Sequence, residues 1–595
     1  MKKTLVLMAL LGGIPAQADL VSHFADGYNI DNFREAYSNP IVGKMCWAAN
    51  ASNVLAWWQD RLLAQGYTLP KDVPQHMELY KEYQAAFTNQ GGYPDAAIEW
   101  WIDGYYTYQT DTGAYYKGLL EQEHNSFNMN SLIAQFFPGT FQDLDLFTNE
   151  IVRRLDSGCA CTASIAAGWS VTVWGVELDT ETNRLTKLYY TDPHDKGKIY
   201  AGDLSITQTP AGDGYVDTYL ISGYGTGNNG TIQYINALNS KLEPFLTEAA
   251  YTDTGEGAFS PFCNAVVDEG KSYTLSTELK AAAQDSALKD KVHGDLTIKD
   301  GTATIADGGS LQGTVKFSDA EKQADRKLAV TRDALEVSKI VVNATKGGNA
   351  LEIAEGKTMI VDSMEGTGVL TLTGKGTLVN GDSLLSAIEV KNGTLQGSGT
   401  FASVIVDGGT LIVGNSPGQQ TYTGDLTVNL GDIVFSVDGW NTAASSAQSG
   451  WGSGTYSNIV MGEGGALSLN DGAIVKFAVG GDALATLLGG TGDFSMDIAT
   501  GIGNTEAFTS AFLQDLALQT KFYVATEDGA VITNNAGLST GDDLSARIYN
   551  LAYNLKDNGV LCLSGSFEQQ VVPEPATGTL SLLALAGLCA RRRRK

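Results

Sequence analysis

The spacing of apolar residues changes along this chain, from a helical pattern near the start to a strand pattern further on. Between residues 46 and 58, apolar side chains recur at intervals of three and four, at Trp47, Ala51, Val54 and Trp58. This spacing predicts an α-helix with one buried face. Residues 164–179 and 184–191 are instead apolar, β-branched runs joined by a short polar segment, which predicts a β-hairpin.

Helices therefore precede an antiparallel sheet in the first third of the chain, as in an α+β domain. The other elements expected there are helices over 76–88, 91–104 and 143–156 and a strand over 215–222. In the second of these helices, a Gly/Pro turn leads into the helix with Asp95 as its N-terminal cap. Residues 236–290 are interpreted as a linker that contains a helix-like run at 276–288.

A third pattern begins at Gly294, where short apolar segments that each start with glycine follow one another as far as Val413. Examples are Gly-Asp-Leu-Thr-Ile, Gly-Thr-Ala-Thr-Ile and Gly-Val-Leu-Thr-Leu. Repeated short strands with few aromatic residues predict a β-solenoid, in which each turn buries a thin apolar stripe and many turns must stack. We assign residues 291–430 to this solenoid.

The region that follows, 431–570, is again β-rich, with helical patches at 482–488 and 509–518. At the junction, residues 414–424 resemble the strand repeats of autotransporter passenger domains. Two roles stay open for this half of the chain. It is either a passive stalk or a solenoid face that binds a glycan or a protein.

The first 18 residues have the pattern of a secretory signal peptide. Two lysines at the start are followed by an apolar run as far as Ile14 and by the small-residue site Ala16-Gln17-Ala18. The apolar run is too short to span a membrane, which favours a cleaved signal over an anchor. We therefore expect the mature chain to be exported.

The other end, residues 571–595, has a Pro-Glu-Pro segment, a short apolar run and a basic ending from Arg591 to Lys595. This arrangement resembles a PEP-CTERM sorting signal. The resemblance implies a Gram-negative exporter, recognition by exosortase-type sorting machinery, removal of the tail and only transient contact with the membrane. The expected location is the outer cell surface or the medium. A plain C-terminal anchor is the alternative.

Length and charge limit the function further. A chain of 595 residues is too long for one core. The 39 basic and 67 acidic residues give a formal net charge of −28, so a nucleic acid partner is not expected. The six cysteines form no dense disulfide framework, and Cys159 and Cys161 are too close for an easy mutual bridge. No metal-binding or cofactor motif is present in the spacing of Cys and His, and none is expected.

Cys46 is the strongest candidate for chemistry. It lies where a loop becomes the predicted helix, so unpaired backbone N–H groups and the helix dipole favour a thiolate there. The segment Cys46-Trp-Ala-Ala, followed by Ser-Asn and a double Trp, resembles the nucleophile helix of the IdeS/Mac family of secreted, papain-like cysteine endopeptidases. The resemblance covers about residues 25–235, and it implies a papain-like α+β fold for residues 19–235 with protein or peptide substrates.

The family's other catalytic residues are only partly matched. Its histidine opens a strand of the form His-x-x-x-x-Trp-Gly, and its acid lies in a Tyr-x-Thr-Asp segment on the next strand. Here Trp174-Gly175 and Asp192 match, but the histidine position holds Trp169. Indole has no basic nitrogen and cannot carry the proton. His194, two residues after Asp192, is the nearest substitute; a solvated loop histidine is the alternative.

The oxyanion donors are less defined. The Cys46 backbone N–H is a natural donor at a helix start, and Arg34 or Lys44 could supply a second. Three interpretations therefore compete. The chain is an exported cysteine endopeptidase, a pseudoprotease that binds proteins without cutting them, or a structural surface protein of the adhesin kind.

Overall fold

The structure is a computed structural model. It describes residues 20–25, 44–88, 90–105, 112–121, 131–138, 144–166, 168–193, 198–211, 214–224, 228–319, 322–414, 417–439, 456–489, 492–525 and 539–567. The expected signal peptide and sorting tail lie outside these residues, as do Arg34, His124 and His194. Strands outnumber helices, and the chain divides into two compact units. The first comprises Met1–Cys263 and Ala282–Val292, and the second Asn264–Ala281 and His293–Lys595.

Four α-helices are described in the first unit. They are α1 (Cys46–Ala64), α2 (Met77–Phe87), α3 (Pro94–Asp103) and α4 (Leu144–Asp156). All four correspond to predicted helices. The cap of α3 was assigned wrongly, because the helix already begins at Pro94, with Tyr93 as the N-cap residue. Proline fixes φ near the helical value and suits the first helical position, so Asp95 lies within the first turn.

The strands of the first unit form one antiparallel sheet that closes on itself. They are β1 (Leu20–Phe24), β2 (Ile133–Phe136), β3 (Cys161–Ile165), β4 (Trp169–Asp179), β5 (Arg184–Thr191), β6 (Ile199–Ala211), β7 (Gly214–Tyr224) and β8 (Asn228–Leu238). The order is β4-β3-β8-β7-β6-β5, and β5 pairs again with β4. The predicted hairpin and the strand over 215–222 are confirmed, whereas β6 and β8 were not anticipated.

Aromatic side chains fill the core between the helices and this sheet. The fully buried tryptophans include Trp47, Trp58, Trp100, Trp101 and Trp174. Ring contacts join elements, as where Trp57 of α1 meets Trp174 of β4 edge-on, with centroids 5.7 Å apart. Because each such ring buries a large apolar area, the core fixes α1 firmly against β4.

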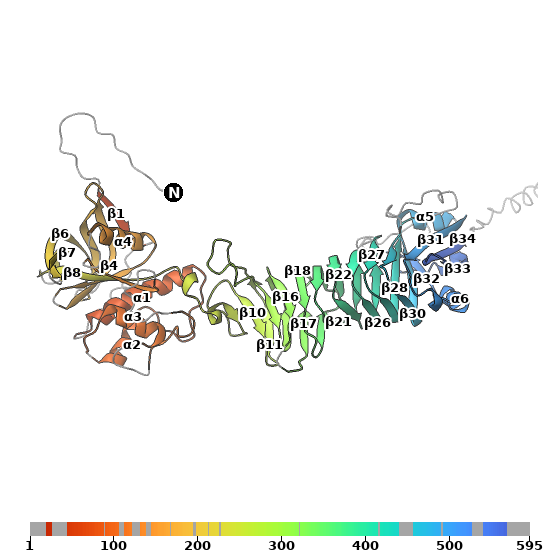
Figure 1. The fold of residues 1–595 in the computed structure, drawn as a ribbon, viewed down its shortest axis with the longest axis horizontal. Coiled ribbons are helices and arrows are strands. Elements are labelled where there is room, and N and C mark those ends of the chain that lie inside the picture. The colour runs from red at the N-terminus through yellow and green to blue at the C-terminus, as the bar shows by residue number, and fades with distance from the viewer. Residues whose placement is uncertain are drawn as a thin grey trace, which may run out of the picture. The chain divides into compact units, whose positions relative to one another are not determined.

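The second unit is a stack of parallel strands (Figure 1). Its strands are β10 (Asn264–Val267), β11 (Ser272–Leu275), β12 (Glu278–Leu279), β13 (Leu296–Ile298), β14 (Gly301–Ile305), β15 (Ser310–Leu311), β16 (Thr314–Phe317), β17 (Arg326–Val330), β18 (Ala334–Val342), β19 (Asn349–Ile353), β20 (Thr358–Glu365), β21 (Val369–Gly374), β22 (Thr377–Leu384), β23 (Ala387–Val390), β24 (Thr394–Gly397), β25 (Gly399–Phe401), β26 (Val404–Val413), β27 (Gln419–Tyr422), β28 (Leu426–Val437), β29 (Asn458–Met461), β30 (Leu467–Val479), β31 (Asp493–Thr500), β32 (Lys521–Val524), β33 (Ile548–Lys556) and β34 (Val560–Phe567).

The register of these strands defines three faces. On the first face, β13 pairs with β16, and β16 with the end of β18; on the second, β14 pairs with β17, and β17 with β19. On the third, the start of β22 pairs with β24, and β24 with the end of β26. Long strands such as β26 contribute to two faces. The predicted stack of short strands is therefore confirmed as a solenoid-like parallel region.

Parallel pairing is not limited to the predicted repeats. It begins at β10, within the expected linker, and continues to β32. The prediction of a helix-like run at 276–288 was wrong, because β12 lies there and pairs with β15. The helical patches are confirmed as α5 (Gly481–Gly489) and α6 (Ser510–Gln519). Antiparallel strands end the stack, since β34 pairs with both β31 and β33.

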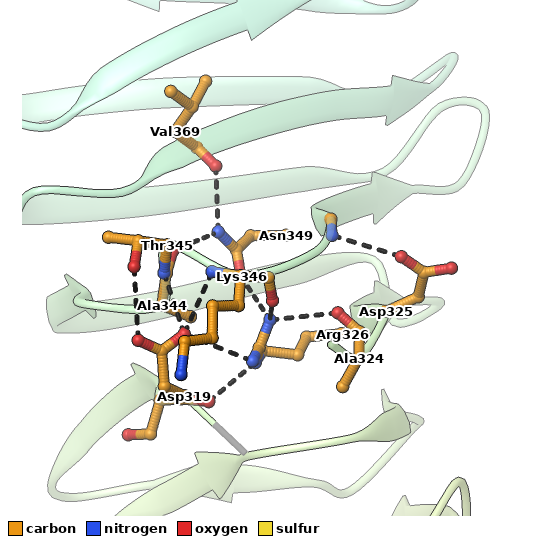
Figure 2. Close-up of polar contacts among 11 residues, drawn as sticks. Asp319, Ala324, Asp325, Arg326, Ala344, Thr345, Lys346, Asn349 and Val369 are labelled. Carbon is orange, nitrogen blue, oxygen red and sulfur yellow. Dashed lines mark hydrogen bonds and ion pairs between the residues drawn. The ribbon is translucent and has the colours of Figure 1, made fainter. Parts of the chain in front are cut away.

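A buried arginine crosses between successive turns of this stack. Arg326 on β17 is 1% exposed. Its Nε donates to the Ser318 carbonyl at 2.6 Å, and its Nη1 donates to the carbonyls of Ala324 at 3.1 Å and Lys346 at 2.8 Å (Figure 2). The guanidinium thus provides hydrogen-bond donors for backbone carbonyl oxygens that are not paired by the strands.

Asn349, at the start of the next strand of the same face, continues this network. Its Nδ2 donates to the carbonyls of Ala344 at 2.9 Å and Val369 at 3.1 Å (Figure 2). Two further buried amides, Asn380 and Gln420, also donate to backbone carbonyls inside the stack. Aromatic rings stack between turns, as in Phe435, Phe477 and Phe522. Among the helices of the described residues, none is long and apolar enough to cross a membrane.

Candidate functional site

Cys46 is the first residue of α1, as the sequence predicted. Its side chain is partly exposed, whereas the thirteen residues that follow are buried. Met45, the N-cap residue, makes no capping hydrogen bond through its side chain. The positive end of the helix dipole therefore lies directly at the thiol, and solvent or a ligand can reach it.

The thiol lies beside the hairpin that joins β3 to β4. Cys46 Sγ is 3.9 Å from the carbonyl oxygen of Gly168, a weak S–H donor contact. Gly168 immediately precedes Trp169, the first residue of β4. The structure thus brings the predicted nucleophile to the backbone of the strand that carries the family's histidine position.

Polar side chains fix this end of α1 to β4. Asn50 Nδ2 donates to the Cys46 carbonyl at 2.8 Å, to the Ser170 carbonyl at 2.7 Å and to Ser170 Oγ at 2.9 Å. Thr172 Oγ1 donates to Asn50 Oδ1 at 2.7 Å. Because all of these atoms are buried or partly buried, their loss would leave polar groups unpaired. Asn50 therefore holds Cys46 in a defined position, a role that the sequence analysis missed.

Strand alternation separates Trp169 from these contacts. Successive side chains of a strand point to opposite faces, and Ser170 and Thr172 are the residues that bond α1. Trp169 pairs with Ile165 across the hairpin and so shares the face of Ile165 and Val171. Its indole is partly buried and packs against the core of the unit.

Asp192 lies directly after β5, which is the neighbour of β4. It is 2% exposed. The preceding residue, Thr191, pairs with Thr172, and its hydroxyl accepts a hydrogen bond from Trp174 Nε1 at 3.2 Å. The Trp-Gly strand and the Thr-Asp strand of the predicted motif are therefore adjacent, as the hairpin pattern required.

Residues that are distant in the sequence interact electrostatically with Cys46. Burial raises the pKa of the Tyr234 phenol on β8, a hydrogen bond with Ser164 opposes this, and Asp95 and Cys46 raise it further. Gln135 Nε2 donates to Asp95 Oδ2 at 3.2 Å. The charges of both Cys46 and Asp95 therefore act on Tyr234. No local sequence signal links these residues.

Carboxyl groups on α3 have raised pKa values. Burial is the largest cause for Asp95, whose hydrogen bonds oppose it. Burial, then the charges of Asp95 and Asp103, raises the pKa of Glu99 to about 7. A carboxyl group with this value can hold or release a proton near neutral pH. Glu99 was not identified from the sequence, because its shift depends on burial and on the helical spacing of three acids.

For the histidines within the described residues, the structure gives contacts with residues other than Cys46. His76 Nε2 is 2.9 Å from Asp60 Oδ1. His23 lies on β1, and its backbone pairs with that of Val176 on β4. His293 belongs to the second unit. His194, the proposed substitute base, lies outside the described residues, and so does Arg34. Lys44 is exposed two residues before the helix.

The other cysteines differ from Cys46 in their surroundings. Cys159 and Cys161 are buried and free, and burial raises the pKa of the Cys161 thiol. Cys263 is free and partly exposed, and burial, followed by the charge of Asp253, raises its pKa to about 11. Within the described part of the chain, no group of three Cys, His, Asp or Glu residues has the arrangement of a metal site.

Comparison with protein-family models gives no match for this chain, and comparison with curated proteins gives none either. Its function must therefore be inferred from the residues around Cys46 and from the solenoid.

Proposed function

We propose that the first unit is a papain-like domain of the IdeS/Mac cysteine endopeptidase type, which receives protein or peptide substrates at Cys46. The observation that carries this proposal is the position of Cys46. Its thiol is partly exposed at the start of a helix whose next thirteen residues are buried, and Asn50 fixes that helix end to β4. A nucleophile needs this combination of access and fixed geometry.

In such a reaction the Cys46 thiolate attacks the carbonyl carbon of a peptide bond, and an oxyanion develops on the carbonyl oxygen. The Cys46 backbone N–H, at the helix start, is a suitable donor for that oxyanion. The leaving amine must receive a proton before it departs. Asp192, which the resemblance assigns as the acid, would orient an imidazole. His194 is the candidate imidazole nearest to it in the sequence.

The second candidate function is a pseudoprotease, a binding domain that retains the cleft but does not cut. Trp169 at the family's histidine position favours it, because indole cannot transfer the proton. In that case the substrate cleft beside Cys46 serves recognition alone. The domain would still select polypeptides, and its ligand would remain intact.

We also propose that the chain is exported and that exosortase-type machinery removes its C-terminal tail, which leaves the protein on the outer surface or in the medium. The support is the sequence pattern of residues 1–18 and 571–595. Intact-mass measurement of protein from its native host tests this. Retention of Arg591–Lys595 in the surface-exposed form contradicts it.

The test of catalysis compares two cysteines of the same unit. Purified full-length protein is incubated with unfolded casein and with a panel of native extracellular proteins, and fragments are identified by mass spectrometry. We expect Cys46→Ala to abolish cleavage and Cys263→Ala, which alters another partly exposed free thiol, to leave it unchanged. Equal cleavage by wild type and Cys46→Ala would exclude the proposal.

Two further arms separate the candidate functions. Loss of cleavage in His194→Ala assigns the proton transfer to that residue. Capture of an uncut protein by wild type favours the pseudoprotease, provided that Lys44→Trp, a bulky substitution at an exposed position two residues before Cys46, weakens capture.

A further inference from the structure

A groove of about 410 Å³ lies on the third face of the second unit, near the C-terminal end of the stack. Side chains from β26, β28, β30 and β32 line it, together with Gly541 and Asp543. The segment around Gly541 forms its end wall, because Gly541 N donates to the Val524 carbonyl at 2.9 Å and Leu544 N donates to the Phe522 carbonyl at 2.8 Å. The described lining of the groove therefore combines paired strands with a segment that is hydrogen-bonded to β32.

Two lysines lie side by side in this groove. Lys476 of β30 and Lys521 of β32 are direct partners in the parallel register, so their strands are only ~4.8 Å apart. Like charges in directly opposed positions are unfavourable. Lys476 pairs with Asp432 at 2.6 Å. Among the described residues Lys521 has no ion pair within 4.0 Å, although its charge acts on Asp543 and lowers the pKa of that carboxyl group. Although the whole chain has a net charge of −28, the two neighbouring lysines favour a bound anionic group at this place.

The same groove also has acceptors for hydroxyl groups. Asp432 and Asp543 are part of its lining. Hydrogen bonds from Ser545, chiefly, lower the pKa of Asp543, so this group stays a carboxylate. Burial, then the charge of Asp432, raises the pKa of Tyr523, so its phenol stays protonated and can donate. A ligand with one anionic group and several hydroxyls would meet all of these side chains.

The floor of the groove is aliphatic. Ile412 and Val434 are partners on β26 and β28, and Val434 is the partner of Lys476 on the next turn. An apolar surface between charged groups suits the C–H face of a sugar ring, whose hydroxyls point outward toward donors and acceptors. A simple inorganic anion would use the lysines but not the aliphatic floor or the two aspartates.

We propose that this groove binds an acidic saccharide. The carboxylate of a uronic acid residue lies between Lys476 and Lys521, the ring hydroxyls bond Asp432, Asp543 and the Tyr523 hydroxyl, and the ring face packs on Ile412 and Val434.

The test uses two tetrasaccharides that differ only in the charged group. Binding of β-1,4-linked tetramannuronate and of β-1,4-linked mannotetraose to the full-length protein is measured by isothermal titration calorimetry at low and moderate salt. We expect tetramannuronate to bind at least tenfold more tightly, with affinity that falls as salt rises. Lys521→Met keeps the aliphatic stem and should weaken binding roughly ten- to a hundredfold, as for a lost charge-assisted hydrogen bond.

The controls decide whether the groove is responsible. Lys375→Met removes an exposed solenoid lysine that pairs with Glu355, and it should leave affinity unchanged. Tyr523→Phe removes only the hydroxyl and should weaken binding severalfold. The proposal is overturned if tetramannuronate does not bind, if mannotetraose binds equally well, or if Lys521→Met binds as wild type does. Equal affinity for tetraglutamate would also overturn it, because that result points to an acidic peptide.

Discussion

The two units of this chain obtain their stability from contacts of very different range. In the first unit, Trp58 Nε1 donates to the Asn239 carbonyl, 181 residues away, and the sheet closes through pairs of distant strands. In the second unit, Arg326 reaches only the neighbouring turn, 20 residues away at Lys346. A closed core is expected to unfold as a whole, whereas a stack in which each turn meets only its neighbours sums local terms. A destabilising substitution should therefore lower the stability of the whole first unit, whereas in the second unit it should affect only the neighbouring turns.

The largest effect is expected from Trp100→Ala. Trp100 is fully buried and contacts Tyr83 and Phe87 with ring centroids 5.0 and 4.9 Å apart. Removing a buried tryptophan costs ~3–5 kcal/mol. We expect differential scanning calorimetry to show the transition of the first unit shifted down as a whole and that of the second unit unmoved. Leu63→Ala, at a position 46% exposed on α1, is the control. A shift of both transitions would contradict the independence of the units.

The next effect is expected from Arg326→Met. The substitution keeps an apolar stem but leaves the carbonyls of Ser318, Ala324 and Lys346 without their donor, at a cost of ~1–3 kcal/mol. Hydrogen exchange measured by mass spectrometry should rise in the adjoining turns and not in β28 or β30. Lys327→Met, which removes the ion pair of Lys327 with Glu352 on the surface, should change exchange little. Uniform loss of protection along the stack would show that its turns are strongly coupled.

A smaller effect on stability, limited to a defined pH range, is expected from the ionisation of Glu99. Its folded pKa of about 7 exceeds the ordinary value of 4.5, so the folded state holds the proton while the unfolded state has released it. The stability of the first unit should therefore fall as pH rises from about 4.5 to about 7, by ~1–2 kcal/mol once solvent screening is allowed for.

Glu99→Gln should remove most of this slope, because the amide stays neutral. Glu78→Gln, at an exposed position on α2, should retain it. Chemical denaturation at several pH values measures both, and an unchanged slope in Glu99→Gln would assign the pH dependence to another group.

The smallest effect is expected from Phe477→Leu. Phe477 stacks between Phe435 and Phe522 with centroids 5.4 and 4.9 Å apart, and loss of such aromatic contacts costs ~1 kcal/mol. We expect a slight rise in hydrogen exchange limited to β28, β30 and β32. Leu518→Ala, 81% exposed on α6, serves as the control. Loss of cooperative melting of the whole second unit would show that the stack does not behave as a sum of neighbouring terms.

The sequence predicted those elements whose signal is local. The period of α1, the apolar runs of β4 and β5, and the repeated Gly-led strands could all be read directly. The run at 276–288 was misread because Ala281, Ala282 and Ala283 favour a helix locally, yet pairing of β12 with β15 prevails. The closure of the sheet through β6 and β8 was missed, since it depends on partners that no short window contains.

The residues of the candidate site likewise divide into those with a local sequence signal and those that come together only in the fold. Cys46 could be located because a helix start is visible in the sequence. Tyr234, Gln135 and Asp95 could not, because they come from β8, β2 and α3 and meet only when the sheet forms. Asn50 lies one turn after Cys46, so its position was visible, but its bonds to Ser170 and Thr172 required the packing of α1 on β4.

The antiparallel strands at the end of the stack also affect how separate molecules meet. A parallel stack ends in a row of unpaired backbone donors and acceptors, which would add strands from another copy of the chain. Here β34 runs antiparallel to both β31 and β33 and so occupies the part of that row formed by β31, with a strand of the wrong direction for continued stacking. A chain cut after β32 would expose the row and is expected to polymerise end to end, so the last thirty or so described residues act as a chain terminator for self-assembly.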